Sequence, residues 1–527
     1  ITSLCVWPCR GQGSARLDVR FFHVKNSTME QQHAYRPDSS FDGGDLDCGS
    51  GLLLLIRRHI DPLVAGQTLE IISTDNTVEV DLPAWCRMTN NELLSLERRS
   101  TGQNSFLVRK GALAGRSLKA AIPPVAPATE RAAIEAPPIR PLSVMGIGSW
   151  PRPRWMLRAV HDRMAGRMAE DEFQAIADDA VSQAVDAQLR AGADVLTDGE
   201  QRRDSYASFV GGILESCQLI PLTDLLPYVD DPVKFEKELR ALDIPAHEVR
   251  HPAVFGRIKR VKPLAVHELA YVRTLSDKPV KIALPGPYLL TRTMWMECLS
   301  DRAYTSREEL AGDIVRIMRE ELADLLRGGA ALVQFDEPVL SEVVFSRTKE
   351  GSGGRSFMCG ALGEKKPIAE ELAFARELIN AVVAGFPRER LAMHVCRGNW
   401  TPDESVAMAG DYRPLLDHFK QIDVGTFMLE LATPRAGEIE VLRELPDHCR
   451  IGVGVINQKL EQTEDIDTVI ARAEAAIALF GAERVLLNPD CGFATFADNP
   501  LASSRLAEAK LKVIATAAAR LRDKYGS

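Results

Sequence analysis

Residues 306–337 read SREELAGDIVRIMREELADLLRGGAALVQFDE, a helix pattern followed directly by a strand pattern. The first part has the apolar spacing of an amphipathic helix, and the pair Gly328-Gly329 suits the end of that helix. Residues 331–337 are then apolar up to two acids, as expected of a short buried strand. One helix and one strand in this order form the unit from which parallel sheets are built.

The same unit recurs through residues 141–527. Most of the strand candidates are separated by long helical patterns, and the candidates are SVMGIGS (143–149), DVLTDG (194–199), VKIALPG (280–286), ALVQFDE (331–337), LAMHVC (391–396), GTFMLEL (425–431), IGVGVI (451–456) and RVLLNPD (484–490). Eight such units predict an α/β protein whose main part is a (β/α)8 TIM barrel. The second connection is longer than one crossover, so we expect a helical insertion near 205–279.

Composition excludes several classes of protein. The chain has 527 residues, 45% hydrophobic and 26% charged, which is typical of a globular protein. A net charge of −9 gives no electrostatic reason to expect nucleic acid or a membrane as partner, and the longest leucine run, Leu52 to Ile56, is too short to span a bilayer. Ten irregularly spaced cysteines make no disulfide scaffold and favour a cytoplasmic location, where a cysteine acts as metal ligand or nucleophile.

A Pro/Ala-rich stretch at 122–141 indicates an interdomain linker, which we place at 113–140. Residues 1–35 show no clear period and contain no methionine before Met29, so we expect a disordered or non-native leader. Between them, residues 36–112 predict a small two-layer α/β sandwich domain in the order β-α-β-α-β-β. Its predicted elements include helices over 51–63 and about 81–95, and strands over 68–74 and 105–110.

Polar residues follow the predicted barrel strands, at the end where a TIM barrel carries its active site. His394 and Cys396 lie two positions apart on one strand, so both side chains point to the same face. Glu430 ends the next strand, and Cys491 follows the eighth. Zinc binds nitrogen, sulfur and oxygen ligands of this kind, and the set predicts one zinc ion per chain. Free cysteines are also often simply buried, and a structural role is our interpretation of Cys449, which precedes a strand.

These segments resemble the catalytic C-terminal barrel of cobalamin-independent methionine synthase. The matches follow the family's order: IGSWPRP (147–153), LTDGEQRRD (196–204), VQFDEPVL (333–340), HVC (394–396), LE (429–430) and NPDCG (488–492). The resemblance implies that zinc is bound by His394, Cys396, Glu430 and Cys491. It also implies that the amino acid part of homocysteine is bound by Ile147, Gly148, Ser149, Glu200 and Asp336. Carboxylates suit an α-ammonium group, and a turn of amides suits an α-carboxylate.

The chain departs from the family pattern at one catalytic position. Lys459 stands where the family has a histidine that acts as the acid toward folate, and the chain resembles the relatives that have a single barrel. Lysine is a weaker acid near neutral pH, so the alkyl donor is open between folate, a corrinoid protein and another compound. We predict Lys459, Glu200 and Asp336 as catalytic residues. The predicted function is zinc-dependent transfer of a methyl group to homocysteine, with a small-molecule thiol and an alkyl donor as partners.

Residues 36–112 resemble the TusA-like sulfur-carrier family, on LDCGSGLLLLIRRHI (46–60), GQTLEIIST (66–74) and DLPAWCRMTNNELL (81–94). Cys48 stands at the family's carrier position without the usual prolines, and a helix N-terminus lowers a thiol pKa. The resemblance implies that Cys48 carries sulfur, and the alternative is a vestigial domain that only docks. Cys86 matches a family position, but we expect it to pack in the core. The alternative function is therefore sulfur trafficking, with a sulfur-relay partner and a zinc barrel that acts on another thiol, including transfer of the coenzyme M type.

Overall fold

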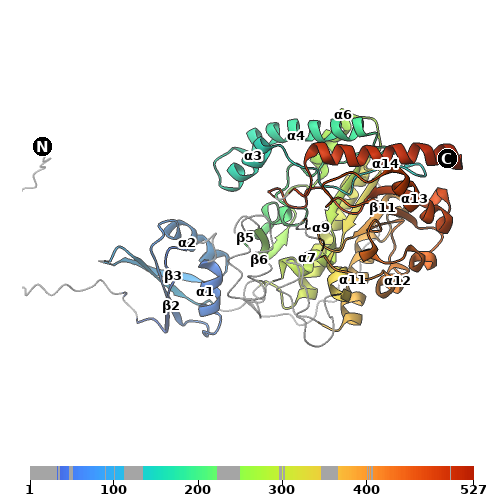
Figure 1. The fold of residues 1–527 in the computed structure, drawn as a ribbon. Coiled ribbons are helices and arrows are strands. Elements are labelled where there is room, and N and C mark those ends of the chain that lie inside the picture. Colours follow the sequence, from blue (N-terminus) through green and yellow to red (C-terminus); the bar gives the residue numbers. More distant parts are fainter. Residues whose placement is uncertain are drawn as a thin grey trace, which may run out of the picture.

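The computed structural model describes two units of the chain, drawn in Figure 1. The predicted leader, the predicted linker and Cys48 lie wholly or largely outside the described residues. The described residues are 33, 36–46, 52–89, 91–99, 101–111, 135–221, 250–295, 300, 303–345, 366–399, 402, 404, 407–498 and 500–526.

The small domain has the predicted order β-α-β-α-β-β. Its elements are β1 (Ser39–Asp42), α1 (Leu53–Ile60), β2 (Thr68–Ser73), α2 (Val78–Met88), β3 (Glu92–Arg98) and β4 (Asn104–Arg109), with the sheet order β1-β2-β4-β3. Only β1 and β2 pair in parallel. Trp85, Cys86 and Phe106 are buried in a core that the two helices share with the sheet, as predicted for Cys86.

The helix predicted at 81–95 is wrong at its C-terminal end. Helix α2 stops at Met88, and residues 92–98 form β3, which pairs with β4 in an antiparallel ladder. The segment ELLSLER consists of good helix formers, but the hydrogen bonds and side-chain burial of the ladder override that local preference.

The large domain is the predicted TIM barrel. The described strands of the barrel itself form one parallel sheet in the order β12-β11-β10-β9-β8-β7. Their bounds are β7 (Lys281–Pro285), β8 (Leu332–Asp336), β9 (Leu391–Val395), β10 (Thr426–Leu429), β11 (Arg450–Ile456) and β12 (Val485–Pro489). The first two predicted strands are reduced to bridges, which close the ring by pairing Val144 with Leu487, Met145 with Val195, and Leu196 with Val280.

Helices surround this ring (Figure 1). The long helix predicted at 306–329 is α9, whose first turn is capped by the Ser306 side chain, which accepts a hydrogen bond from the backbone of Glu309 at 3.3 Å. The helices are α3 (Arg154–Met164), α4 (Glu170–Ala191), α6 (Val266–Leu275), α7 (Pro287–Met294), α9 (Arg307–Arg327), α10 (Val339–Phe345), α11 (Ile368–Val383), α12 (Arg413–Phe419), α13 (Ile466–Phe480) and α14 (Ser504–Tyr525).

The insertion after the second strand, for which we expected a helical subdomain, contains two strands in its described part. Its described part begins with a 3-10 turn at Ser208–Gly212 and continues as an antiparallel pair, β5 (Glu215–Pro221) and β6 (Arg250–Lys259). Residues 222–249 lie outside the described residues. The barrel helix α6 follows this pair. Among the described residues, no helix is both long and apolar enough to cross a membrane.

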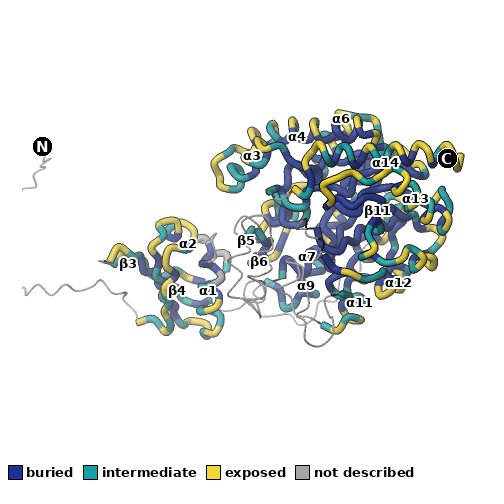
Figure 2. Tube along the Cα trace, in the orientation of Figure 1, coloured by how far each residue is buried: buried dark blue, intermediate teal, exposed yellow. Residues whose placement is uncertain are grey.

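The inside of the barrel is layered. Apolar side chains fill its lower part, and Figure 2 shows the strands as the buried centre of the domain. This inner cluster consists of Met145, Ile147, Val195, Leu332, Ala392, Met428 and Leu486. Side chains alternate along each strand, so the inward residue two positions after Ala392 is His394, and the one after Met428 is Glu430. The polar residues therefore lie above the apolar floor, at the C-terminal ends of the strands, where TIM barrels carry their active sites.

Candidate active site

A cavity of about 50 Å³ at the C-terminal ends of the strands brings together two groups of predicted residues. Four predicted substrate residues line it, namely Ile147, Ser149, Glu200 and Asp336, and so do three predicted metal ligands, namely His394, Cys396 and Cys491. Gly148 lies directly behind Glu200, whereas Glu430 and Lys459 are not part of the lining. The lining residues that sequence analysis missed are Tyr206, Pro338, Asn399, Gly492, Thr495 and Phe496.

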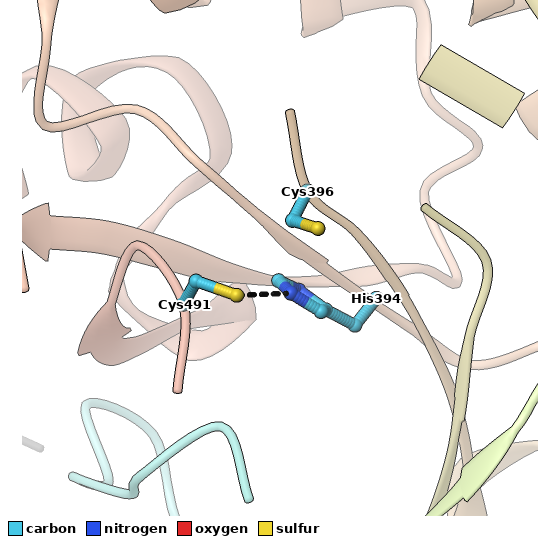
Figure 3. A group of neighbouring side chains, drawn as sticks. All are labelled: His394, Cys396 and Cys491. Carbon is cyan, nitrogen blue, oxygen red and sulfur yellow. Dashed lines mark hydrogen bonds between the residues drawn. The ribbon is translucent and has the colours of Figure 1, made fainter. Parts of the chain in front are cut away.

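His394, Cys396 and Cys491 form a compact group of metal-binding atoms. One ligand atom from each residue lies within 4.8 Å of the other two, and all three residues are buried. His394 Nδ1 lies 2.9 Å from the Met428 carbonyl and donates to it, which leaves Nε2 facing Cys491 Sγ at 3.4 Å (Figure 3). This backbone hydrogen bond fixes the imidazole orientation in the way that metal-binding histidines usually require.

The electrostatics of this group favour a thiolate. A hydrogen bond from the Cys491 thiol holds the pKa of Cys396 well below its usual value, and the same contact raises the pKa of Cys491. Burial lowers the pKa of His394, but the hydrogen bond and charge of Cys396 raise it overall. One imidazole nitrogen and two sulfur atoms fit zinc, which accepts both ligand types in a tetrahedral shell. These three residues can therefore hold a metal ion.

The structure does not bring Glu430 into that group. Glu430 Oε1 accepts a hydrogen bond from the backbone N–H of Arg397 at 3.0 Å, and Oε2 pairs with Arg435 at 3.2 Å. Arg435 also pairs with Glu404 at 2.9 Å. Burial and then the negative charge of Cys396 raise the pKa of Glu430. The carboxylate is therefore near the sulfur ligands but is bound to a guanidinium group.

Glu200 is held in a strained and buried position. Its backbone has φ 55°, a left-handed conformation that is unusual for a residue with a side chain, and the residue is 3% exposed. Its Oε2 has no hydrogen-bond partner among the described residues, and burial raises its pKa to about 8. Gly148 makes room for this carboxylate, because a Cβ there would overlap Glu200 Oε1. An unsatisfied acid in a small cavity is a suitable partner for a bound cation.

Ser149 follows Gly148 and lies beside the loop after β12. Its Oγ accepts a hydrogen bond from the backbone of Ala494 at 3.2 Å, and the hydroxyl proton stays available for an acceptor. Gly492 permits this approach, because a Cβ there would overlap Ser149 Oγ. The second predicted acid, Asp336, accepts from Gln334 Nε2 at 2.6 Å, and burial raises its pKa to about 6. A hydroxyl donor and two acids suit the two ends of an amino acid.

Two further residues join the loops that carry the metal-binding group. Asp490 Oδ1 accepts from the backbone N–H groups of Leu431 and Ala432, at 2.8 and 2.9 Å, and so ties the loop after Glu430 to β12. Asn399 Nδ2 donates to Gly492 O at 2.8 Å, which ties the loop after β9 to Cys491's loop. Both residues follow the end of a strand. In the sequence, Asp490 also stands in the segment NPDCG, whereas only its position after β9 points to Asn399.

Lys459 is buried beside the cavity rather than in its lining. The residue is 5% exposed, and its Nζ has no hydrogen-bond partner among the described residues. Burial lowers its pKa, against the opposing charges of Glu404 and Glu430. A buried ammonium group without a partner is costly and marks a position that a ligand with an acceptor would satisfy.

Comparisons with known proteins identify the family of the large domain. The sequence profile described as "Cobalamin-independent synthase, Catalytic domain" matches residues 142–221, 238–355 and 378–519. The chain belongs to this family. A methionine synthase of Saccharolobus solfataricus is 26% identical over 359 residues, which cover 67% of this chain and 88% of that protein. A methionine synthase of Thermococcus kodakarensis is 28% identical over 359 residues, which cover 67% and 87%.

Two solved structures have a fold similar to that of this chain. A B12-independent methionine synthase from Shewanella sp. W3-18-1, in complex with selenomethionine, has a TM-score of 0.54 at 19% identity and covers 73% of this chain and 98% of that one. A putative vitamin-B12 independent methionine synthase from Listeria monocytogenes has a TM-score of 0.50 at 17% identity, with the same coverage of 73% and 98%. The profile "Sulfurtransferase TusA" matches residues 51–110, so the small domain is TusA-like.

Proposed function

We propose that this protein is a zinc-dependent methyltransferase that methylates the thiol of homocysteine to give methionine. The observation that supports it most is the single cavity, in which the group His394, Cys396 and Cys491 faces the two acids Glu200 and Asp336. If the sulfur of homocysteine lies next to the metal-binding group, the small size of the cavity brings its amino group within reach of Glu200 and Asp336. The family match and the names of the relatives point the same way.

His394, Cys396 and Cys491 are the proposed zinc ligands, with Glu430 as the proposed fourth. Zinc, when bound, supplies a Lewis acid that lowers the pKa of a coordinated thiol. The backbone hydrogen bond from His394 to Met428 orients the imidazole, and the Asp490 contacts hold the loop of Glu430 against that of Cys491. Glu430 would leave Arg435 to bind the metal in this proposal, and it would be the ligand that a substrate thiol could replace.

The substrate is positioned by the opposite wall of the cavity. Glu200 and Asp336 bind the α-ammonium group, while Ser149 and the backbone of Ile147 and Gly148 bind the α-carboxylate. The thiolate sulfur then attacks the methyl carbon, a sulfur–carbon bond forms, and the bond from that carbon to the donor breaks. The donor keeps the electron pair and requires a proton, for which Lys459 is the proposed source. Binding both ends of the substrate restricts the sulfur to one position for an in-line attack.

The methyl donor is tested directly by supplying purified protein with homocysteine and one donor at a time. The donors are methyltetrahydrofolate with one or several glutamates, and a methylated corrinoid, and methionine is measured by mass spectrometry. Methionine from one donor, lost in Cys491→Ala, supports the proposal. A protein that contains no zinc and makes no methionine with any donor overturns it.

A sulfur-carrier role for Cys48 has less support and is proposed only as an addition. The TusA profile match begins at residue 51, and Cys48 lies outside the described residues. Incubation with a cysteine desulfurase, followed by intact mass measurement, tests whether Cys48 gains a sulfur atom. Absence of that gain, in a protein that still methylates homocysteine, removes the sulfur-trafficking alternative.

A further inference from the structure

A chain of buried polar side chains runs from the floor of the barrel up to Asp336. Lys281, on β7, is 0% exposed, and its Nζ donates to Gln334 Oε1 at 2.6 Å. Gln334 is equally buried, and its Nε2 donates to Asp336 Oδ1 at 2.6 Å. In the strand register Lys281 pairs with Leu332, so the lysine starts one layer below Gln334 and two below Asp336. These three side chains thus connect the apolar floor of the barrel with the wall of the cavity.

Burying the ammonium group of Lys281 at this position costs free energy. No carboxylate among the described residues lies within ion-pair distance of its ammonium group, and the nearby acids Asp336 and Glu200 act on it only through space. Burial lowers its pKa to about 7, against the attraction of those two acids. An apolar side chain of similar length would fill the same volume without the desolvation cost. Seven apolar side chains form the inner cluster of the barrel floor, so packing alone does not explain a lysine there.

The chemistry of an amide explains what the ammonium group does. A glutamine amide has an acceptor end and a donor end that are nearly equal in shape, so its neighbours decide which way it points. Lys281 Nζ donates to Gln334 Oε1, and it therefore holds the oxygen of Gln334 toward itself. The amide N–H must then face Asp336, where it binds Oδ1 and leaves Oδ2 for a ligand in the cavity. Without Lys281, the Gln334 oxygen loses its buried donor, and only Asp336 then orients the amide.

We propose that Lys281 is a positioning residue that acts through Gln334 to orient Asp336 for an α-ammonium group, and that it sets the preference for amino thiols over thiols without an amino group. This inference rests on the proposed binding of homocysteine. It adds a specificity device that lies below the cavity and touches neither substrate nor metal. Its expected signature is a loss that depends on the substrate's amino group.

The test compares two thiols on the zinc-loaded full chain. Calorimetry measures the dissociation constants of homocysteine and of 4-mercaptobutanoate, which lacks only the amino group, for wild type, Lys281→Met, Gln334→Leu and the double variant. Lys281→Met is expected to bind homocysteine about tenfold more weakly, the effect of one misoriented buried hydrogen bond to a charged group, and 4-mercaptobutanoate as wild type does. Because both residues act in one chain, the double variant is expected to lose no more than Gln334→Leu alone.

Each other outcome has a defined meaning. An equal loss for both thiols in Lys281→Met indicates general damage to the barrel and overturns the positioning role. Losses that multiply in the double variant also overturn it, because Lys281 then acts independently of Gln334. If Lys281→Met does not fold, the ratio of the two thiol affinities in Gln334→Leu decides the question alone. A wild-type chain that binds neither thiol overturns the proposed function, and this inference with it.

Discussion

Glu430 Oε2 lies 3.2 Å from Arg435, and this ion pair holds the proposed fourth zinc ligand beside the other three. The guanidinium group neutralises a carboxylate that is 0% exposed and repelled by Cys396. Removing the arginine leaves a buried charge that needs another cation. The pair therefore defines a competition between Arg435 and a metal ion for the same acid.

Replacing Arg435 with leucine is expected to tighten metal binding. In Arg435→Leu the metal-free protein is destabilised, because Glu430 loses its partner, and a bound zinc ion relieves that loss. We expect the apparent zinc affinity, measured by competition with a chelator, to rise about tenfold. Arg413→Leu, which removes an exposed partner of Asp411, is the control. An unchanged affinity in Arg435→Leu would show that Glu430 does not reach the metal.

Metal content is expected to depend on two of the buried cysteines but not on a third. Cys396→Ala and Cys491→Ala each remove one sulfur from the group within 4.8 Å, and both variants are expected to lose most of the zinc found in wild type. Cys449→Ala is the matched control, because Cys449 is also buried but packs in the hydrophobic core, where its Sγ donates to the Val424 carbonyl at 3.8 Å. Elemental analysis of the purified proteins measures the zinc content. Zinc retained by both Cys396→Ala and Cys491→Ala would contradict the proposed zinc site.

A single methyl group behind Glu200 is expected to weaken homocysteine binding. In Gly148→Ala the new Cβ overlaps Glu200 Oε1, so the carboxylate must shift away from its place in the cavity. We expect the dissociation constant for homocysteine to rise about tenfold or more, since small misplacements of a positioning group are costly. Gly146→Ala is the control, because a Cβ there has no neighbour within 4 Å. Equal affinities in the two variants would remove Glu200 from the binding site.

Lys459 is expected to influence turnover more than thiol binding. It is buried next to the cavity but does not line it, so Lys459→Met should keep the affinity for homocysteine. If its proton goes to the departing donor, the turnover number falls about a hundredfold, and Lys459→His recovers part of it. Steady-state kinetics with the active donor, together with calorimetry for homocysteine, separate the two effects. A variant with normal turnover would assign Lys459 to structure.

The sequence predicted the barrel because each of its strands is a short apolar run that ends in polar residues. It also predicted that His394 and Cys396 share one face of a strand, and the structure brings both together with Cys491. It did not predict Arg435, Asn399 or Lys281. Their importance depends on side-chain contacts between loops and strands that are far apart in the chain, and those contacts follow only from the closed ring. The helix predicted over residues 92–95 was wrong for the same reason. Pairing with β4, rather than local helix preference, decides the conformation of β3.

The preference for an amino thiol is expected to increase with pH. Burial raises the pKa of Glu200 to about 8 and that of Asp336 to about 6, so both carboxyls bind protons that compete with a substrate ammonium group. As pH rises through these values the acids ionise, while the homocysteine amine keeps its proton until higher pH. The ratio of the affinity for homocysteine to that for 4-mercaptobutanoate cancels the titration of the thiol, which both ligands share. We expect this ratio to rise about tenfold between pH 6 and pH 8.5, and to flatten near pH 8 in Glu200→Gln. A ratio that stays constant in wild type would show that neither acid binds the amino group.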